Sequence, residues 1–570
     1  MKKLITISVI TASSLLAVFT PNVDSTLQSI QVPKEVETIG QSKKEPLVEI
    51  GGKSKYAPVM KDDKSGKKVF VKNFSIEGNT HINSNELTTL ILEYANKDLS
   101  FDDLTQVASI ITKYYRDKGF FVARAYIPMQ DLNTNEGKVR IAVIEGSYGD
   151  FKLTNISLVK DEIVQGMLDD AKNRDNVVST DTLERAMLII NDTPGVKVTG
   201  ADVMPGVEVG TSDFKISSDK RAAYDGYVIA DNYGSLYSGK NRVMAGLNLN
   251  SPARLGDKLS ISGLISNGAD LQNGRFAYGL PLMSNGLRGE VSYSKTNYDL
   301  VRLGSGMEDG ANNGTTSTIE VSATYPIIRT RLETLNMSAS ITKKDAQDFI
   351  NFTQLSKDRD LKATTFGLNH SKNQTLFDFD ARITTEGSLT FGKLDIVDAT
   401  SKTTDKAGAN TQGDYSKLNV NLGANLVFDP NFSLNTSLKT QYALNNKNLD
   451  GSEDMSVGGS NGVKVYPDGE LSGENGYVMN LELFSQLPQA EGISQKLGFF
   501  YDIGSVNMSD SSKDTTFKQK TLQDIGIGYY VNYQDMFAKV QFAKVVGGHD
   551  VTTENKGNTS RILFQAGWVF

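Results

Sequence analysis

Regular alternation of apolar and polar residues runs through the C-terminal part of the chain, from about residue 222 to residue 570. One segment carries apolar side chains at every second position, Val243, Ala245, Leu247 and Leu249, with Arg242, Met244, Gly246 and Asn248 at the positions between them. Because the side chains of a strand point alternately to its two faces, this pattern predicts strands with one apolar face and one polar or glycine-rich face. Loops rich in Gly, Asn, Asp, Ser and Lys separate the segments, and no helix is predicted in this region.

Sixteen such segments are present, an even number, as a closed antiparallel sheet in a bacterial outer membrane requires. A strand of about ten residues, rising about 3.3 Å per residue, can cross an apolar layer of about 25 Å when it is tilted by about 45°. The segments begin near Tyr224, Arg242, Lys258, Arg275, Leu287, Ser317, Leu335, Lys362, Phe379, Tyr415, Ser433, Tyr477, Gln495, Leu522, Phe537 and Arg561. A soluble sandwich or β-helix would instead gather its apolar residues into one core. The repeated apolar face therefore predicts a 16-stranded antiparallel transmembrane β-barrel over residues 217–570.

Residues 67 to about 215 combine helical spacing with short strand-like runs, in the same order twice. The first copy, residues 67–146, is predicted as strand Val69–Ile76, helices that start at the capping-box pairs Asn83/Glu86 and Ser100/Asp103, and strands Phe120–Ile127 and Lys138–Ile144. The second copy, residues 147–216, is predicted as strand Phe151–Leu158, helices Asp161–Asp170 and Asp181–Ile190, and strands Val196–Val198 and Val207–Val209. The predicted fold class is α+β plus all-β, with two small β-α-α-β-β domains followed by the barrel.

The N-terminus has the pattern of an export signal. Met1-Lys2-Lys3 precedes the apolar run Leu4–Phe19, which Pro21 ends. A membrane anchor is the alternative, but the run is shorter than the span of about 20 residues and contains five hydroxyl side chains. Residues 1–23 are therefore predicted to be a cleaved signal peptide, and residues 24–66 a solvated linker.

The composition of the chain argues against several classes of function. The chain has 570 residues, with 60 basic and 67 acidic side chains and a net charge of −7, so no basic excess indicates nucleic acid as a partner. A mean hydropathy of −0.31 excludes a bundle of transmembrane helices, each of which needs about 20 apolar residues in a row. With no cysteine and three histidines, the chain lacks disulfides and thiolate metal sites, and a multi-histidine site is disfavoured. No metal and no cofactor are expected.

Two short motifs suggest chemistry but lack the surroundings that the chemistry needs. Gly458-Gly459-Ser460-Asn461-Gly462 matches G-x-S-x-G, yet a nucleophile elbow requires a strand, a sharp turn and a helix, and no helix is predicted here. Gly52-Lys53-Ser54 resembles the end of a P-loop, but Leu47 stands where that motif needs a glycine. No catalytic residue and no enzymatic activity are therefore predicted.

The last ten residues form an amphipathic strand that ends at the chain terminus. Ile562, Phe564, Ala566, Trp568 and Phe570 share one face, and Trp568 is the only tryptophan of the chain. An aromatic pair at a strand end suits the membrane interface. The terminal Phe570 also resembles the signal that the barrel-assembly machinery reads, so this machinery and outer-membrane lipid are expected partners.

Motifs in both small domains resemble those of one protein family. The first domain carries Gly78-Asn79 after its first strand, Tyr115 and Gly119 around the end of its second helix, Tyr126, Pro128 and Gln130 after the next strand, and Glu145-Gly146 at its end. The second domain carries Leu183-Glu184-Arg185, Ile189–Asp192 and Pro194–Val196. On these residues the chain resembles the two-partner secretion outer-membrane transporters, the TpsB or haemolysin secretion/activation family of the ShlB/FhaC/HecB type. The resemblance covers residues 67–570 and implies that both domains are POTRA domains.

Two motifs in the barrel carry the same resemblance. Val463-Lys464-Val465-Tyr466 matches the family's Val-Arg-Gly-Tyr/Phe at the tip of a long loop folded into the pore, with Lys in place of Arg and Val in place of Gly. The family's aromatic-x-Asp-x-Gly strand motif is present as Phe500, Asp502 and Gly504, which alternation assigns to the lumen face. The resemblance therefore predicts that Lys464 lies close to Asp502. The family's N-terminal plug helix has no clear counterpart, because Pro33, Pro46 and Pro58 interrupt the linker.

The resemblance implies a transporter of the outer membrane, with its POTRA domains in the periplasm. Such a transporter captures a large, unfolded, β-helical exoprotein of the adhesin or haemolysin type and secretes it through the barrel without ATP, as in type Vb secretion. An outer-membrane protein assembly factor of the BamA type is the alternative, although it is disfavoured by the presence of two POTRA domains rather than more. A plain porin would leave residues 67–215 without a role.

Overall fold

A computed structural model describes residues 51–52, 68–131, 136–300, 312–350, 355–489, 492–513, 517, 519–547, 549–554 and 557–570. The predicted signal peptide and almost all of the predicted linker lie outside these residues. No helix in the described part of the chain is both long and apolar enough to span a membrane.

The C-terminal part of the chain is a closed sheet of sixteen antiparallel strands, as predicted, in which each strand pairs with its neighbours in chain order. The strands are β10 (Tyr224–Asp231), β11 (Arg242–Asn250), β12 (Lys258–Ser266), β13 (Leu271–Pro281), β14 (Arg288–Leu300), β15 (Asn312–Arg329), β16 (Glu333–Ile350), β17 (Leu355–Leu376), β18 (Phe379–Ile396), β19 (Gly413–Val427), β20 (Phe432–Ala443), β23 (Asn475–Gln486), β24 (Ile493–Asn507), β25 (Lys520–Tyr533), β26 (Met536–Val545) and β27 (Ser560–Val569). The last strand pairs with the first, so the barrel has no free edge.

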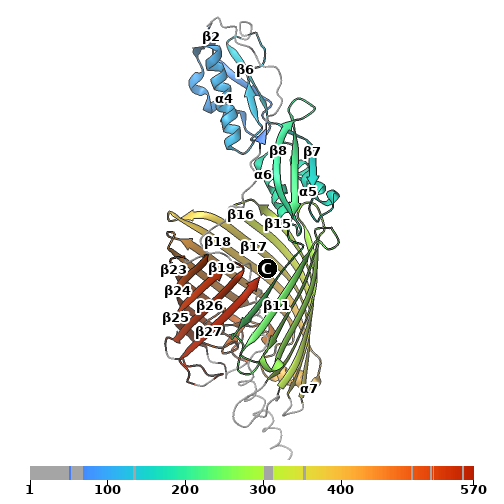
Figure 1. The fold of residues 1–570 in the computed structure, drawn as a ribbon, viewed down its shortest axis with the longest axis vertical. Coiled ribbons are helices and arrows are strands. Elements are labelled where there is room, and N and C mark those ends of the chain that lie inside the picture. The colour runs from blue at the N-terminus through green and yellow to red at the C-terminus, as the bar shows by residue number, and fades with distance from the viewer. Residues whose placement is uncertain are drawn as a thin grey trace, which may run out of the picture.

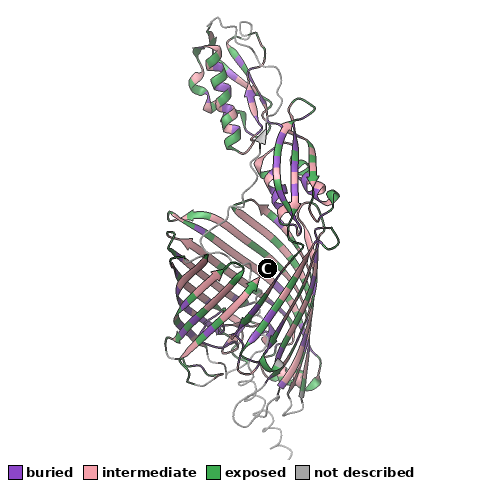
Figure 2. Cartoon of the chain, viewed as in Figure 1, coloured by how far each residue is buried: buried purple, intermediate pink, exposed green. Residues whose placement is uncertain are grey.

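Alternation along the strands separates the two sides of the wall (Figure 2). On β11, Val243 is 47% exposed on the outer face, whereas Arg242 is 2% exposed on the inner face. The predicted assignment of faces therefore holds on this strand, and outward apolar residues recur around the barrel. Gly226 and Phe570 complete the closure, since each donates its backbone N–H to the other's carbonyl oxygen, at 2.8 and 2.9 Å.

Two small α/β modules lie beyond one rim of the barrel (Figure 1). We call this rim proximal and the opposite rim distal. The connections at the proximal rim are short, whereas the distal connections include the long segment between β20 and β23. A distal connection also contains helix α7 (Ala399–Ala407), capped by the Asp398 side chain, which accepts from Ser401 N at 2.6 Å. The prediction that this region has no helix was wrong, because α7 buries no residue and so leaves no apolar pattern in the sequence.

The first module spans residues 69–146 and contains β2 (Val69–Val71), β3 (Asn73–Glu77), α3 (Ser84–Leu90), η1 (Leu92–Tyr94), β4 (Lys97–Leu99), α4 (Phe101–Asp117), β5 (Arg124–Tyr126) and β6 (Lys138–Ile144). Ser100 and Asp103 form the predicted reciprocal capping box. The predicted first strand is divided at Lys72 into β2, which pairs with β4, and β3, which pairs with β6. At the break, the backbone N–H of Lys72 donates to Gly137 O.

Two other expectations for the first module need correction. Asn83 caps α3 by accepting from Asn85 N at 2.8 Å, but Glu86 accepts a hydrogen bond from Tyr114 OH rather than completing a capping box. The strand predicted over Phe120–Ile127 is reduced to the three residues of β5. In the first case a tertiary hydrogen bond replaces the predicted cap, and in the second an irregular turn replaces most of the predicted strand.

The second module spans residues 147–220 and contains β7 (Ser147–Asn155), α5 (Asp161–Arg174), α6 (Thr180–Asn191), β8 (Val196–Pro205) and β9 (Thr211–Lys220). The strand predicted over Val207–Val209 was wrong, since both valines are exposed in the turn between β8 and β9. The strand that follows was missed because it is mostly polar, although Phe214 and Ile216 are fully buried on one of its faces.

Glu145 and His81 link the first module to the second. The Glu145 carboxylate accepts from the backbone N–H of His81 at 2.8 Å and from the hydroxyl of Tyr115 at 2.8 Å. The His81 ring lies between two carboxylates, with Nδ1 2.8 Å from Glu145 and Nε2 2.9 Å from Asp175 of the second module. A further backbone bond from Thr180 N to Gly119 O, 2.8 Å, fixes the same joint.

The electrostatics of this joint favour a charged imidazole. The hydrogen bond to Glu145 raises the pKa of His81 above its usual 6.5, partial burial works against this, and Asp175 raises the pKa further. For Glu145, burial raises the pKa, but hydrogen bonds from His81, Thr80 and Tyr115 outweigh this effect and hold the pKa below its usual value. An imidazolium between two carboxylates therefore joins the modules.

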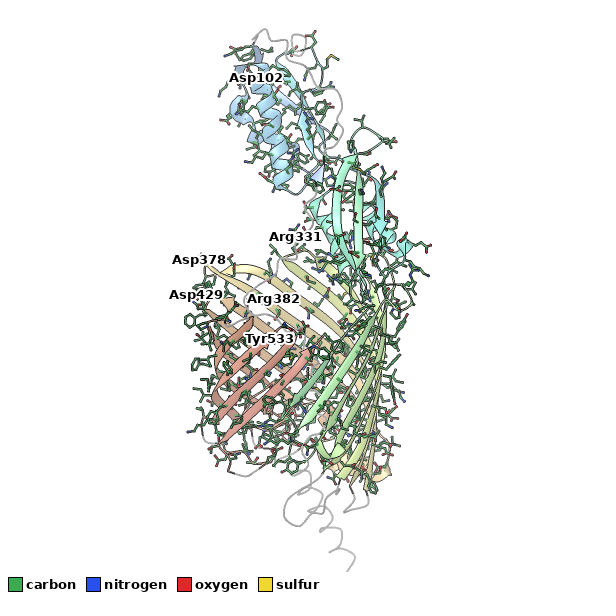
Figure 3. All side chains as sticks on the ribbon, in the orientation of Figure 1. Asp102, Arg331, Asp378, Arg382, Asp429 and Tyr533 are labelled. Carbon is green, nitrogen blue, oxygen red and sulfur yellow. The ribbon has the colours of Figure 1, made fainter. Side chains whose placement is uncertain are left out.

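Helix α6 seats the second module on the proximal rim. Arg185, which is 6% exposed, donates to the carbonyl oxygens of Pro326 and Ile327 on β15. Arg329 binds Asp192 through two hydrogen bonds of 2.7 Å. Figure 3 labels Arg331 on this rim, and its backbone N–H donates to Glu184 at 3.0 Å. The second module is thus held against the β15–β16 side of the barrel.

The joint yields a prediction about pH. We expect His81 to titrate above pH 6.5, because both carboxylates stabilise its protonated form. The stability that this charge contributes is fully present below the unfolded value of about 6.5 and is lost as the pH rises through the raised folded pKa. NMR of the full chain with labelled histidines measures the midpoint.

Asp175→Asn should lower that midpoint, whereas His370→Gln, which removes a barrel histidine, should leave it unchanged. A midpoint for His81 at or below 6.5 in the unmodified chain would contradict the assigned network.

Candidate functional site in the barrel lumen

The connection between β20 and β23, residues 444–474, folds back into the barrel, and we call it the lumen loop. It contains η3 (Gly451–Glu453) and a two-stranded ribbon of β21 (Met455–Ser456) and β22 (Ser472–Gly473). Its tip is apolar and almost fully buried, with Val463, Val465 and Tyr466 between 0% and 2% exposed. These side chains belong to one cluster with inward residues of β24, β25 and β26, which are Phe500, Leu522 and Ala543.

At the tip of the loop, the ion pair expected between Lys464 and Asp502 is formed. Lys464 Nζ lies 2.8 Å from Asp502 Oδ2 and 3.0 Å from Oδ1. Lys464 is 7% exposed and Asp502 is 0% exposed. The ammonium also lies 4.4 Å from the centroid of the Phe500 ring, a cation–π contact. Asn480 completes the site by donating from Nδ2 to Asp502 at 2.7 Å and to Gly462 O at 2.8 Å.

A second buried carboxylate faces this ion pair. Asp524 on β25 lies directly opposite Asp502 in the sheet register and accepts from the backbone N–H of Val465 at 2.6 Å. Burying a charge is unfavourable unless a partner of opposite charge and hydrogen bonds compensate for the lost water. The loop tip supplies the ammonium of Lys464 to Asp502 and the backbone N–H of Val465 to Asp524. Alternation assigns Asp524 to the inner face, but only the register reveals that it belongs to this site.

The same tip also contacts the side of the barrel where β27 closes the sheet with β10. The hydroxyl of Tyr466 donates to His549 O, and Arg561 on β27 donates to Tyr466 O at 3.0 Å. Farther along the loop, Glu470 accepts from the backbone N–H groups of Thr552 and Thr553, at 2.8 and 3.1 Å. The loop therefore contacts the connection that precedes the last strand as well as β24 and β25.

The other end of the lumen loop is held by a second set of ion pairs, which we call the η3 anchor. Glu453 lies 2.9 Å from Lys344 of β16 and 3.0 Å from Lys417 of β19. Asp450 lies 2.6 Å from Arg359 of β17. The loop thus spans the lumen between two walls of the barrel. The η3 anchor leaves no signal in the sequence, since inward lysines and arginines are common on the polar face and nothing in the chain marks their partners.

The remaining motif residues have local roles. Gly459, within the G-x-S-x-G match, has a φ of +97°, and a Cβ there would overlap Asp468. Ser460 lies in a turn of the lumen loop, with no helix after it before β22. Gly504 is buried beside Val457 of the loop, where a Cβ would approach that side chain to 2.5 Å.

In the first module, the motif residues shape the end of the domain that faces the second module. Gly78 has a φ of +82°, and a Cβ there would lie 2.3 Å from Val143 O. Gly146 has a φ of +88° and packs against Val122 in the same way. Asn79 Nδ2 donates to Ile82 O at 2.8 Å and so holds the turn before α3.

Gln130 extends the small sheet of the first module. Its side-chain amide donates to Arg140 O at 2.8 Å and accepts from Arg140 N at 2.9 Å, in the manner of a paired strand residue. Its Nε2 also donates to Pro128 O at 3.3 Å. Tyr126 lies at the end of β5, one residue from Ile127, which is buried.

Trp568 and Phe570 lie at the proximal end of β27 on the outer face. They are 47% and 38% exposed, and their ring centroids are 4.5 Å apart. Within the described residues, no group of three or more His, Asp or Glu side chains is arranged to hold a metal ion.

Comparison with known proteins agrees with this architecture. The profile of the haemolysin secretion/activation protein ShlB/FhaC/HecB matches residues 210–529, more than half of the chain, and the ShlB-type POTRA domain matches residues 69–146. The chain is 26% identical to the heme/hemopexin transporter protein HuxB of Haemophilus influenzae over 496 residues, which cover 86% of this chain and 85% of that protein. It is 22% identical to the hemolysin transporter protein HpmB of Proteus mirabilis over 519 residues, which cover 88% of this chain and 86% of that protein.

A solved structure of CdiB from Escherichia coli has the same fold, with a TM-score of 0.72 and 18% identity over 90% of this chain and 93% of that one. The barrel lies in the outer membrane and the modules lie in the periplasm, so the proximal rim is periplasmic and the distal rim is extracellular. The chain belongs to the haemolysin secretion/activation protein family ShlB/FhaC/HecB, the two-partner secretion transporters of the outer membrane.

Proposed function

We propose that the lumen loop is the gate of this transporter and that the buried Lys464–Asp502 pair holds it closed. The observation that carries the proposal is the position of the loop, which lies in the lumen and is paired at both ends. An exoprotein in transit needs the space that the loop occupies. Secretion therefore requires the loop to leave its partners, which then exchange protein contacts for water.

We infer that the periplasmic modules capture the exoprotein as an extended chain. Sheet edges accept an added strand through backbone hydrogen bonds. The edge strand β8 of the second module already carries such an addition, since Gly51–Gly52 of this chain, strand β1, pairs with it in parallel at Asp202 and Val203. An extended cargo segment would use the same donors and acceptors.

The proposed cargo is a large secreted β-helical protein of the adhesin or haemolysin type. Two relatives support a secreted partner, since their names describe transport of heme/hemopexin and of hemolysin. The chain has no complete P-loop, and we propose that folding of the cargo outside the cell drives export. An assembly factor of the BamA type is not favoured, because the family match is to secretion proteins and the chain has two POTRA-like modules.

We further propose that β27 carries the signal for insertion by the barrel-assembly machinery. Its outward Trp568 and Phe570, whose ring centroids are 4.5 Å apart, suit an interfacial position. No catalytic step is proposed, since Ser460 lies in a turn of the lumen loop.

Our first prediction for the gate concerns Asp502→Ala. Breaking a buried ion pair by removing one partner costs about 3 to 5 kcal/mol, so the loop should leave its closed position more often. The conductance of single barrels in planar lipid bilayers should therefore rise while insertion stays normal. Lys464→Arg should keep the closed state, since Arg preserves the charge and the contact with the Phe500 ring.

Ser460→Ala is the matched control in the same loop and should leave conductance and secretion unchanged. Wild-type conductance of Asp502→Ala would exclude a holding role for the pair. Loss of export by Ser460→Ala, with a normally inserted barrel, would instead revive a catalytic role.

The second prediction concerns the η3 anchor. Glu453→Gln leaves Lys344 and Lys417 without their carboxylate, so the loop should also loosen and conductance should rise as in Asp502→Ala. Lys343→Gln on the outer face of β16 is the control, since it changes the same strand without touching the loop. If Glu453→Gln conducts like the unmodified barrel, the tip alone holds the loop.

The third prediction concerns capture. Deletion of residues 67–145 removes the first module but leaves the contacts of Arg185 and Asp192 with the barrel. We expect the truncated chain to insert, to show heat-modifiable migration in gels, and to lose export of the cognate exoprotein. Normal export by this chain would refute a capture role for the first module.

A further inference from the structure

Three lysines form a row across the outer face of the barrel on β16, β17 and β18. Lys343 lies directly opposite Lys362, and Lys362 lies directly opposite Lys393. All three are exposed. Like charges that face each other across strands repel and destabilise the sheet, and carboxylates nearby on the same face reduce this repulsion.

The chain itself compensates for one of these charges. Lys343 Nζ lies 2.9 Å from Asp345, two residues farther along the same strand. Asp414 of β19 lies opposite Lys393 in the register but forms no ion pair with it. Among the described residues, neither Lys362 nor Lys393 takes part in an ion pair. Two neighbouring ammonium groups therefore remain available on the outside of the wall.

The row marks the extracellular edge of the apolar belt. β16 runs from the periplasmic rim at Glu333 to the extracellular rim at Ile350, and Lys343 follows the outward residues Met337 and Ile341, which are 50% and 65% exposed. Phe391, 49% exposed, precedes Lys393 on β18 in the same way. The lysines thus lie at the depth where the acyl chains of the outer leaflet end and the headgroups begin.

A groove opens on the outer wall at this edge. It has a volume of about 530 Å³, and its lining includes Lys362, Lys393 and Asp414 together with Ile341, Thr364 and Phe391. The cationic side chains lie on its extracellular side and the apolar side chains lie toward the membrane centre. A phosphate on the lysines and an acyl chain along Ile341 and Phe391 match this order.

Carboxylates limit how far out an anion can lie. Asp345, Asp360 and Asp395 face one another in the next outward row of the same strands, about 6.6 Å beyond the lysines at the usual rise per residue. They repel an anionic group at their own level. Asp414 lies at the depth of the lysines, directly opposite Lys393, so a bound phosphate is confined to that depth and to the side of Lys393 that faces Lys362.

We propose that β16–β18 bind a phosphorylated, acylated glycolipid of the outer leaflet, with its phosphate on Lys362 and Lys393 and an acyl chain in the groove below. The lipid relieves the repulsion within the lysine row. It also attaches the wall that carries Lys344, Arg359 and Lys417, the inner partners of the η3 anchor, to the surrounding membrane.

Native mass spectrometry of the full chain in detergent tests the proposal, with diphosphorylated lipid A as the probe. We expect Lys362→Gln/Lys393→Gln to bind this lipid about thirtyfold more weakly, the effect of removing two basic side chains at an anionic membrane surface. Lys295→Gln/Lys544→Gln is the matched control. It removes two outward lysines that face no other lysine and should bind like the unmodified chain.

Lys362→Arg/Lys393→Arg should retain binding, which separates loss of charge from loss of folding. Phosphatidylethanolamine and inorganic phosphate serve as the other probes. Equal lipid A binding by the glutamine variant and its control would overturn the proposal. It would also fail if phosphatidylethanolamine bound equally well, or if inorganic phosphate alone displaced the lipid.

Discussion

Hydrogen bonding of the backbone in lipid is the constraint on which the rest of this structure depends. Inside a bilayer no water satisfies a free N–H or C=O group, so a strand wall has to close on itself. Here the closure is made by β27 beside β10 and ends in the reciprocal bonds between Gly226 and Phe570. Because the wall has no edge, its polar inner face is separated from lipid, and charged side chains can gather there.

The lumen loop illustrates how such charges are made compatible with burial. Lys464 contacts Asp502 and the Phe500 ring, and Glu453 lies between two lysines. Each of these groups has exchanged water for partners on another element. Moving the loop would therefore separate charges at both of its ends.

The periplasmic modules are attached to the barrel by a similar series of specific polar contacts. His81 connects the first module to the second through two carboxylates, and Arg185 with Asp192 connects the second module to the rim. Residues that read as family motifs, such as Glu145 and Arg185, lie at these joints. These motif residues thus contribute to the contacts between the modules and the barrel.

Alternation in the sequence determined all sixteen barrel strands, because the side to which a strand residue points depends only on its position along that strand. Helical spacing and the Ser100 cap determined α4 in the same local way. The Lys464–Asp502 pair followed from resemblance to a known motif. Alternation could not identify Asp524, the partners of Glu453 or the row of Lys343, Lys362 and Lys393. It assigns each residue to a face, but which residues on separate strands lie opposite one another is decided by register and closure of the whole sheet.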